Sequence, residues 1–224
     1  MKKNYIIIIL LILIILVSIS LVFKPNLRDF SILDTKYTKL MIVAHPDDEV
    51  MWGFSELLNN DYLVVCITCG SSTKRVREFI KVMDYTNDDY IMLNYPDKIK
   101  GERTDWKDEY NYIVNDIERI MDYKDWDIVV THNPKGEYGH IHHKITSNIV
   151  TNISNKDKLM YFGKYYKKNK VPKDLNKIEE DILSKKKYII DNVYKTQKNV
   201  LYGMEHIFMY EDLITYKEWG ELYD

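Results

Sequence analysis

The sequence has few cysteines and no excess of charge of either sign. Cys66 and Cys69 are its two cysteines, and no second Cys-x-x-Cys pair exists to complete a zinc knuckle. They lie at the end of an apolar run, which predicts that both are small side chains of a buried strand. The 32 Lys and Arg residues are balanced by 34 Asp and Glu residues, for a net charge of −2. The composition therefore gives no broad basic surface for nucleic acid.

A glycine-rich phosphate loop is also missing. None follows the first apolar run of the main part of the chain, near residue 40, which argues against a nucleotide-binding module. No internal repeat is evident. The 224 residues suit one domain with a short appendage.

The longest uncharged stretch, residues 5–23, stands at the amino terminus. As a helix its nineteen residues would span about 28 Å, close to the hydrocarbon thickness of a bilayer. We therefore predict a single-pass membrane anchor over 1–24 and a polar connector over 25–39. The alternative is a cleaved signal peptide, but the run exceeds the ~7–15 apolar residues typical of one and no Ala-x-Ala site follows. Lysines flank both ends, so the orientation is left open.

Beyond the connector, short apolar runs alternate with stretches of helical periodicity. Strands are predicted at 40–44, 62–68, 90–93 and 127–131, and helices at 49–59, 74–85, 106–123 and 141–152. This alternation predicts an α/β fold over 40–224, a Rossmann-like, mostly parallel sheet flanked by helices. In such folds ligands bind where the loops after the strands meet. These loops cover 44–49, 68–73, 94–104 and 131–140.

The first of these loops reads Ala44-His45-Pro46-Asp47-Asp48-Glu49. Carboxylates this close repel one another unless a cation or a proton lies among them. His and Asp together suit zinc or another divalent transition ion. The alternative is a capped helix start, with Asp47 or Asp48 as the N-cap residue.

The last loop and the helix after it hold four of the six histidines of the chain, His132, His140, His142 and His143. Positions 140 and 143 are three apart at a helix start, so they share one side of it. With the first loop they provide three metal ligands, His45, Asp48 and His143, and leave a coordination position open for water. Asp47 is then available as a general base and His140 as an acid for the leaving group.

The two motifs together resemble those of the LmbE-like de-N-acetylases, which include the N-acetylglucosaminyl-phosphatidylinositol deacetylases. Ala-His-Pro-Asp-Asp-Glu after a first strand and Gly-His-x-x-His late in the domain carry the resemblance, over roughly 40–149. Weaker similarities include Arg75-x-x-Glu78 and Asn94-Tyr95-Pro96-Asp97. The resemblance implies a metal-dependent hydrolase that removes the acetyl group from an N-acetylated amino sugar.

The resemblance also implies a role for each matching residue. The metal ligands are His45, Asp48 and His143; the catalytic residues are Asp47, His140 and Tyr138; the substrate-binding residues are Arg75 and Asp97. Tyr138 would stabilise the oxyanion. Zinc is the expected metal, with ferrous iron as the alternative. One residue departs from the family pattern, because His142 stands where Asp or Asn is frequent, and this leaves the pH optimum open.

Two further expectations concern substrate and activity. The predicted anchor favours a lipid-linked sugar such as N-acetylglucosaminyl-phosphatidylinositol, because tethering confines enzyme and substrate to one membrane surface. A soluble or polymeric amino sugar is the alternative. The rival function is a membrane-tethered sugar-binding protein without turnover, but a binder has no need of Asp47. The oligomeric state is left open.

Overall fold

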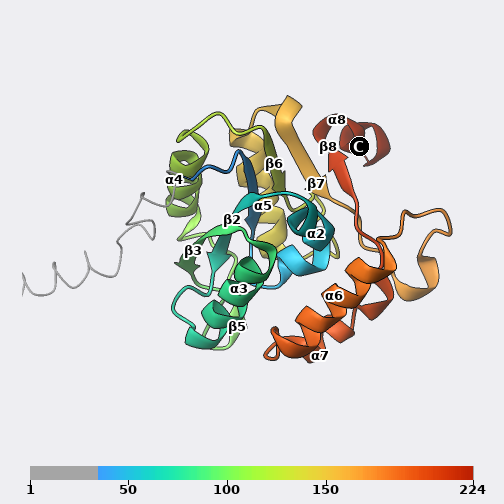
Figure 1. The fold of residues 1–224 in the computed structure, drawn as a ribbon. Helices are drawn as coiled ribbons and strands as arrows, with labels where there is room; N and C mark the ends of the chain where they lie inside the picture. The colour runs from blue at the N-terminus through green and yellow to red at the C-terminus, as the bar shows by residue number, and fades with distance from the viewer. Residues whose placement is uncertain (1–34, 224) are drawn as a thin grey trace, which may run out of the picture.

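The computed structural model describes residues 35–223, which form a three-layer α/β domain (Figure 1). Its central sheet has six strands in the order β3-β2-β1-β6-β7-β8. All neighbouring pairs are parallel except β7 with β8. The strands are β1 (Lys39–Val43), β2 (Tyr62–Thr68), β3 (Asp89–Tyr95), β6 (Ile128–Thr131), β7 (Leu159–Phe162) and β8 (Leu213–Thr215). The predicted Rossmann-like, mostly parallel sheet is therefore confirmed.

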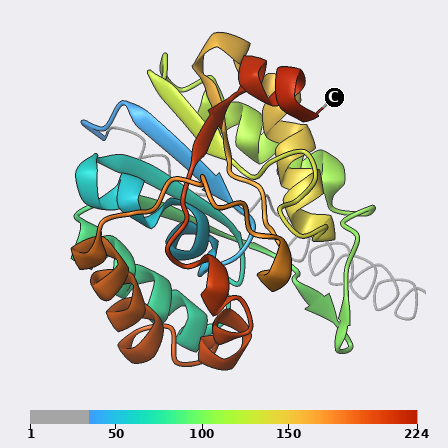
Figure 2. The ribbon, with the colours of Figure 1, turned by 90° about the vertical axis from the view of Figure 1, so that its right-hand side faces the viewer.

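Helices cover both faces of this sheet (Figures 1 and 2). They are α2 (Asp48–Asn59), α3 (Thr73–Thr86), α4 (Tyr110–Met121), α5 (Ile141–Ile153), α6 (Glu180–Asn192), α7 (Lys198–Tyr202) and α8 (Tyr216–Tyr223). Alternate residues of β1 enter different layers, as the pleat requires. Leu40 and Ile42 belong to a core cluster shared with α4, α5 and α8, whereas Met41 and Val43 belong to one shared with α2, α3 and α6.

The four predicted strands and four predicted helices are all present, with shifted ends. The largest shift is in α4, which begins at Tyr110 and not at residue 106. Trp106 has a φ of 52°, which is incompatible with a right-handed helix. Its ring is fully buried and its Nε1–H donates to the carbonyl of Pro96 at 2.7 Å, so tertiary contacts keep this residue out of the helix.

Several elements were not predicted. β7, β8, α6, α7 and α8 all lie beyond residue 155, and a two-stranded hairpin, β4 (Lys98–Ile99) with β5 (Glu102–Arg103), projects from the loop after β3. These strands are only two to four residues long, too short to show a period.

The predicted anchor over 1–24 and most of the connector lie outside the described residues. Within the part that is described, residues 35–223, no helix combines the length and the apolar character needed to cross a membrane.

The loops at the carboxyl ends of the strands meet as predicted. The side chain of Thr68, at the end of β2, donates to the carbonyl of Ala44 at 2.8 Å. On the other side of β1, the backbone N–H of Ala44 donates to Nε2 of His132 at 3.0 Å. Gly70 N–H donates to the carbonyl of Leu93 at 3.0 Å, which brings the loop after β2 against β3. The motif after β1 therefore lies between the other loops.

A buried ion pair links this region to the carboxyl-terminal part of the chain. Helix α2 is interrupted at Gly53, whose φ and ψ are −142° and 24°. The Nζ of Lys186 donates to the carbonyl of Met51 at 2.8 Å, and the backbone N–H of Ser55 donates to Glu211 at 2.7 Å. A regular helix would pair these two backbone groups with each other. Lys186 and Glu211, 2.8 Å apart, thus replace the hydrogen bond that the kink breaks.

We predict that Lys186→Met destabilises the protein by about 3 kcal/mol, because it leaves the Glu211 carboxylate buried without its cation. The matched control is Lys185→Met on the next residue, whose ion pair with Asp181 is exposed and contributes little. Urea unfolding measures both. Similar unfolding free energies for the two variants would contradict the assignment.

Candidate active site and metal centre

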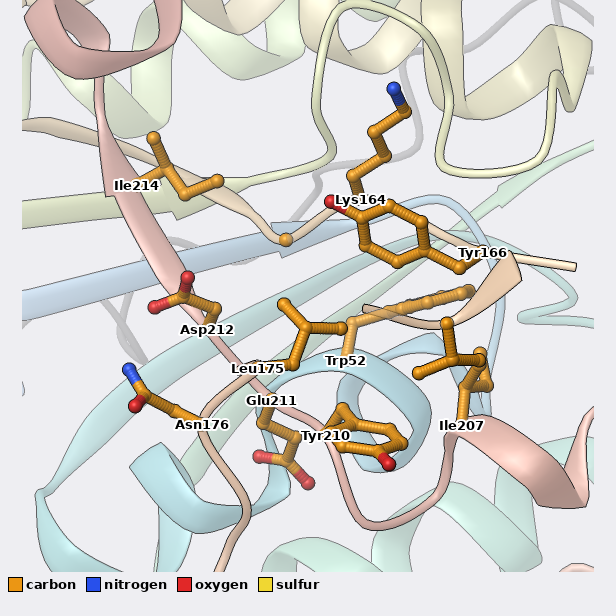
Figure 3. A pocket seen from close by; sticks show the side chains of 12 residues that line it. Trp52, Lys164, Tyr166, Leu175, Asn176, Ile207, Tyr210, Glu211, Asp212 and Ile214 are labelled. Carbon is orange, nitrogen blue, oxygen red and sulfur yellow. The ribbon is translucent and has the colours of Figure 1, made fainter. Parts of the chain in front are cut away.

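The largest group of titratable side chains lies in a cleft at the carboxyl edge of the sheet. The cleft has a volume of about 270 Å³ and is lined by seven of the eight predicted site residues, His45, Asp47, Asp48, Arg75, Asp97, Tyr138 and His140. The eighth, His143, lies beneath them, 1 % exposed. A smaller hollow of about 40 Å³, beside Tyr166 and Tyr210, contains no histidine (Figure 3). The cleft is therefore the candidate active site.

The turn from β1 into α2 places the first motif. Asp47 occupies the N-cap position but its side chain makes no capping hydrogen bond, so the capped-helix alternative does not explain this residue. Its φ is 119°, a left-handed conformation that is costly for any residue but glycine. Such strain is typical of functional sites. Asp48 instead folds back, and its Oδ2 accepts a hydrogen bond from the backbone N–H of His45 at 2.7 Å.

The three predicted metal ligands are brought together. One ligand atom from each of His45, Asp48 and His143 lies within 4.8 Å of the others. Asp48 stands between the imidazoles, with Oδ2 at 3.2 Å from Nδ1 of His45 and Oδ1 at 3.2 Å from Nε2 of His143. All three residues are buried.

Glu137 determines which nitrogen of His143 is free. Its Oε2 lies 2.5 Å from Nδ1 of His143, and a carboxylate can only accept, so Nδ1 carries the proton. The neutral ring then has its lone pair on Nε2. That atom is buried and finds no hydrogen-bond partner among residues 35–223. A buried unpaired acceptor facing a carboxylate is unfavourable unless a proton or a metal cation lies between them.

His142 and Thr104 determine the tautomer of His45 in the same way. The carbonyl of Thr104, 2.9 Å away, accepts from Nε2 of His142, so Nδ1 of that neutral ring is an acceptor. It lies 3.0 Å from Nε2 of His45, which must donate to it. Nδ1 of His45 therefore has a free lone pair, and it faces Asp48. The two nitrogens and the carboxylate match the ligand set of a catalytic zinc site.

His142 thus supports His45, although the sequence showed it only as a departure from the family pattern. Its ring stacks on Trp106 with centroids 3.9 Å apart. Burial and the neighbouring His45 lower the pKa of His142 to about 3, so the ring is neutral and can accept the hydrogen bond. His142 is thus a neutral acceptor for the N–H of His45.

Two other triads of possible ligands exist in the described part of the chain, His45–His140–His142 and His132–Glu137–His143. Their atoms already pair with one another or with the backbone. Nδ1 of His132 lies 3.1 Å from Glu137, and its Nε2 accepts from Ala44. We therefore assign His132 and Glu137 as supports of the ligands.

The sequence did not identify Glu137, His132 or Glu49 as site residues. Glu137 has a φ of 49° after Gly136, and this left-handed turn directs its carboxylate inward. Glu49 is fully buried and accepts from the backbone N–H of Asp47 at 3.0 Å and from the hydroxyl of Tyr194. The sequence does show a glutamate at each motif, Glu49 in the first and Glu137 just before the second. Their burial, which marks them as site residues, cannot be recognised from the sequence of a loop.

Asp47 has the surroundings of a general base. Burial raises its pKa to about 6, and Arg75, whose Nη2 lies 3.4 Å from Oδ2, limits the increase. Arg75 also donates to the carbonyl of Pro46, so the guanidinium is fixed beside the motif. A carboxylate with a pKa near neutrality is suited to accept a proton from water.

His140 is the N-cap residue of α5, and its Nδ1 accepts from the backbone N–H of His142 at 3.2 Å. Arg103, from the β4–β5 hairpin, contacts Nε2 of the same ring. Burial and the nearby His143 and His45 lower the pKa of His140 to about 2. Tyr138 places its ring 5.8 Å from His140 and 5.6 Å from His143, centroid to centroid.

Asp97 lies between two cationic or donor groups. Its Oδ1 is 3.0 Å from Arg103 and 3.5 Å from Nε2 of His45. Although burial acts in the opposite direction, His45 and Arg103 lower the pKa of Asp97. Substrate contact by Asp97 and Arg75 stays a prediction, since both side chains line the cleft and also hold neighbouring site residues.

Comparisons with known proteins agree with this fold. The model of the family described as "PIG-L: GlcNAc-PI de-N-acetylase" matches residues 40–154. An uncharacterized protein of Acanthamoeba polyphaga mimivirus is 33% identical, with 74% of each chain covered. Among solved structures, an N,N'-diacetylchitobiose deacetylase from Pyrococcus horikoshii has a TM-score of 0.50 at 15% identity, with 86% of each chain covered. The last likeness concerns the fold alone.

We predict that Glu137→Gln weakens zinc affinity by about 10- to 100-fold, because the amide no longer fixes the tautomer of His143. Competition with a chelator measures the affinity. Glu102→Gln, an exposed position on the hairpin, is the control and retains wild-type affinity. Equal zinc affinity in both variants would exclude the proposed tautomer.

Proposed function

The chain belongs to the PIG-L family of GlcNAc-PI de-N-acetylases, and from this we propose that it is a metal-dependent hydrolase acting on an N-acetylated amino sugar. One observation carries the proposal. Lone pairs of His45 and His143 and the carboxylate of Asp48 converge in a cleft beside a general base, Asp47. A sugar-binding site would need neither the converging ligands nor the base.

Each catalytic residue has a separate role in the reaction. When bound, the divalent cation supplies Lewis acidity, which polarises the amide carbonyl and acidifies a water. Asp47 takes one proton from that water as its oxygen attacks the carbonyl carbon. The Tyr138 hydroxyl donates to the developing oxyanion. As the C–N bond breaks, the nitrogen receives the proton that Asp47 removed. His140 assists this transfer to the leaving nitrogen.

The substrate we propose is lipid-linked, such as N-acetylglucosaminyl-phosphatidylinositol, and zinc is the metal we propose. The uncharged stretch at 5–23 supports a lipid-linked substrate, because an anchor would hold the cleft near the membrane. The nitrogen and oxygen ligands support zinc over harder cations, and ferrous iron remains the alternative. A membrane-tethered sugar-binding protein without turnover is the rival.

The test is acetate release from the zinc-loaded protein, with N-acetylglucosamine, a soluble conjugate and vesicle-embedded N-acetylglucosaminyl-phosphatidylinositol as substrates. We expect Asp47→Asn to lower kcat by at least about a hundredfold with zinc retained, because the base is lost. His143→Ala loses both zinc and activity. Turnover that survives chelation and His143→Ala would disprove the metal role, and equal rates in wild type and Asp47→Asn would disprove the base.

The pH dependence of kcat/KM gives a separate prediction. Asp47 must be ionised, so kcat/KM falls as the pH drops through its pKa. Arg75 favours the carboxylate, and its removal raises that pKa. We therefore expect Arg75→Leu to move the acid limb to higher pH by about one unit. Arg75→Lys keeps the charge and should leave the limb close to wild type. An unshifted limb in Arg75→Leu would contradict this role.

A further inference from the structure

Arg103 lines the cleft beside two of the predicted site residues, yet it belongs to neither motif. Its Nη1 contacts Nε2 of His140 and lies 3.0 Å from Oδ1 of Asp97. Among residues 35–223 these are the hydrogen-bonding contacts of the guanidinium, so the donors on Nη2 and Nε are available to a ligand. The side chain is 39 % exposed, and a ligand in the cleft can therefore reach it.

The backbone next to Arg103 is fixed to the site. Thr104, the following residue, donates its N–H to the carbonyl of Asp97 at 3.2 Å and its hydroxyl to the carbonyl of Pro96 at 2.9 Å. Its own carbonyl accepts from Nε2 of His142 at 2.9 Å. The position of Arg103 in the cleft is thus set by its neighbours, and only its long side chain is free to rearrange.

Stability of the fold does not account for the ion pair that Arg103 forms. The side chains of Arg103 and Asp97 are 39 % and 28 % exposed. Ion pairs in contact with water contribute little to the free energy of unfolding, because water already solvates both charges. The pair therefore matters more for what enters the cleft than for folding.

The ring of His140 has a hydrogen-bond donor at each of its nitrogens. Nδ1 accepts from the backbone N–H of His142, so the neutral ring carries its proton on Nε2. A guanidinium can only donate, and Arg103 therefore meets that N–H donor to donor. The contact is relieved when both groups find acceptors. Because α5 holds the backbone of His142, the Arg103 side chain is the group that moves.

An N-acetylated amino sugar supplies both acceptors. If His140 assists the leaving nitrogen, its Nε2 comes within hydrogen-bond reach of that nitrogen. Arg103 contacts the same Nε2, so its guanidinium then lies beside the sugar atoms that flank the nitrogen. In N-acetylglucosamine the nitrogen is on C2, and C1 and C3 on either side each carry an oxygen. Either oxygen can accept from a guanidinium.

Given the proposed function, we propose that Arg103 is a specificity-determining residue. It leaves His140 when the amino sugar binds, and it donates to the oxygen on C1 or C3, next to the acetamide carbon. Asp97 keeps the guanidinium at the cleft when no sugar is bound. Binding thus replaces a donor–donor contact with hydrogen bonds that only a sugar with an oxygen beside its amide can form.

The experiment measures binding without turnover, by calorimetry on the zinc-loaded full chain carrying Asp47→Asn. The ligand is the methyl glycoside of N-acetylglucosamine. Adding Arg103→Met should weaken its binding roughly tenfold, because a hydrogen bond from a charged donor is lost. Lys98→Met is the matched control and keeps the affinity, since Lys98 is exposed on the same hairpin but does not line the cleft.

The 3-deoxy and 1-deoxy analogues of this ligand identify the oxygen. For the analogue that lacks the oxygen bound by Arg103, Arg103→Met should cause little further loss, because the hydrogen bond is already absent. For the other analogue the roughly tenfold loss should remain. Losses that add fully for both analogues would overturn the proposal, as would an Arg103→Met variant that binds the parent ligand as tightly as its background.

Acetate release from the protein with Asp47 intact separates this inference from the proposed function. Arg103→Met should raise KM by about tenfold and keep kcat within about twofold, because it removes binding and not chemistry. A lowered kcat at unchanged KM would contradict the role. Coupling between Arg103 and one analogue without any acetate release supports Arg103 and counts against the hydrolase. Acetate release with fully additive losses does the reverse.

Discussion

The site depends on one electrostatic constraint, the convergence of unprotonated nitrogen atoms and a carboxylate on one point. His45 and His143 can direct their lone pairs at Asp48 only because their other nitrogens donate elsewhere, to His142 and Glu137. Without a cation this arrangement is unfavourable in a buried site. The outer hydrogen bonds hold it in place, and they extend to the backbone carbonyl of Thr104, the residue after β5.

The carboxyl-terminal part of the chain holds the same site from another direction. Glu49 and Glu78 accept hydrogen bonds from Tyr194 and Thr196, and the Lys186–Glu211 pair replaces a broken hydrogen bond of α2. The residues beyond 154 therefore complete the domain around its catalytic motifs. They also add Gln197, Val200, Leu201 and Met204 to the lining of the cleft.

A neutral histidine at position 142 has a consequence for the metal ligands. A carboxylate in this place would accept a charge-assisted hydrogen bond and increase the basicity of His45. The imidazole accepts a weaker one, yet Trp106 and Thr104 fix its ring and its tautomer. The orientation of His45 is thereby kept, and its electronic support is reduced.

The sequence by itself determined the alternating strands and helices and the two motifs, because periodicity and residue type are local. From these the meeting of His45, Asp48 and His143 could be predicted, since parallel strands bring their following loops to one edge. The site roles of Glu137 and Glu49, and the place of Val200 in the lining of the cleft, could not be predicted. Burial of a loop carboxylate, the left-handed turn at Gly136 and the approach of Val200 to the cleft depend on contacts between residues far apart in the chain. Only the tertiary structure decided which nitrogen of each histidine is free, because that choice depends on where its partners lie.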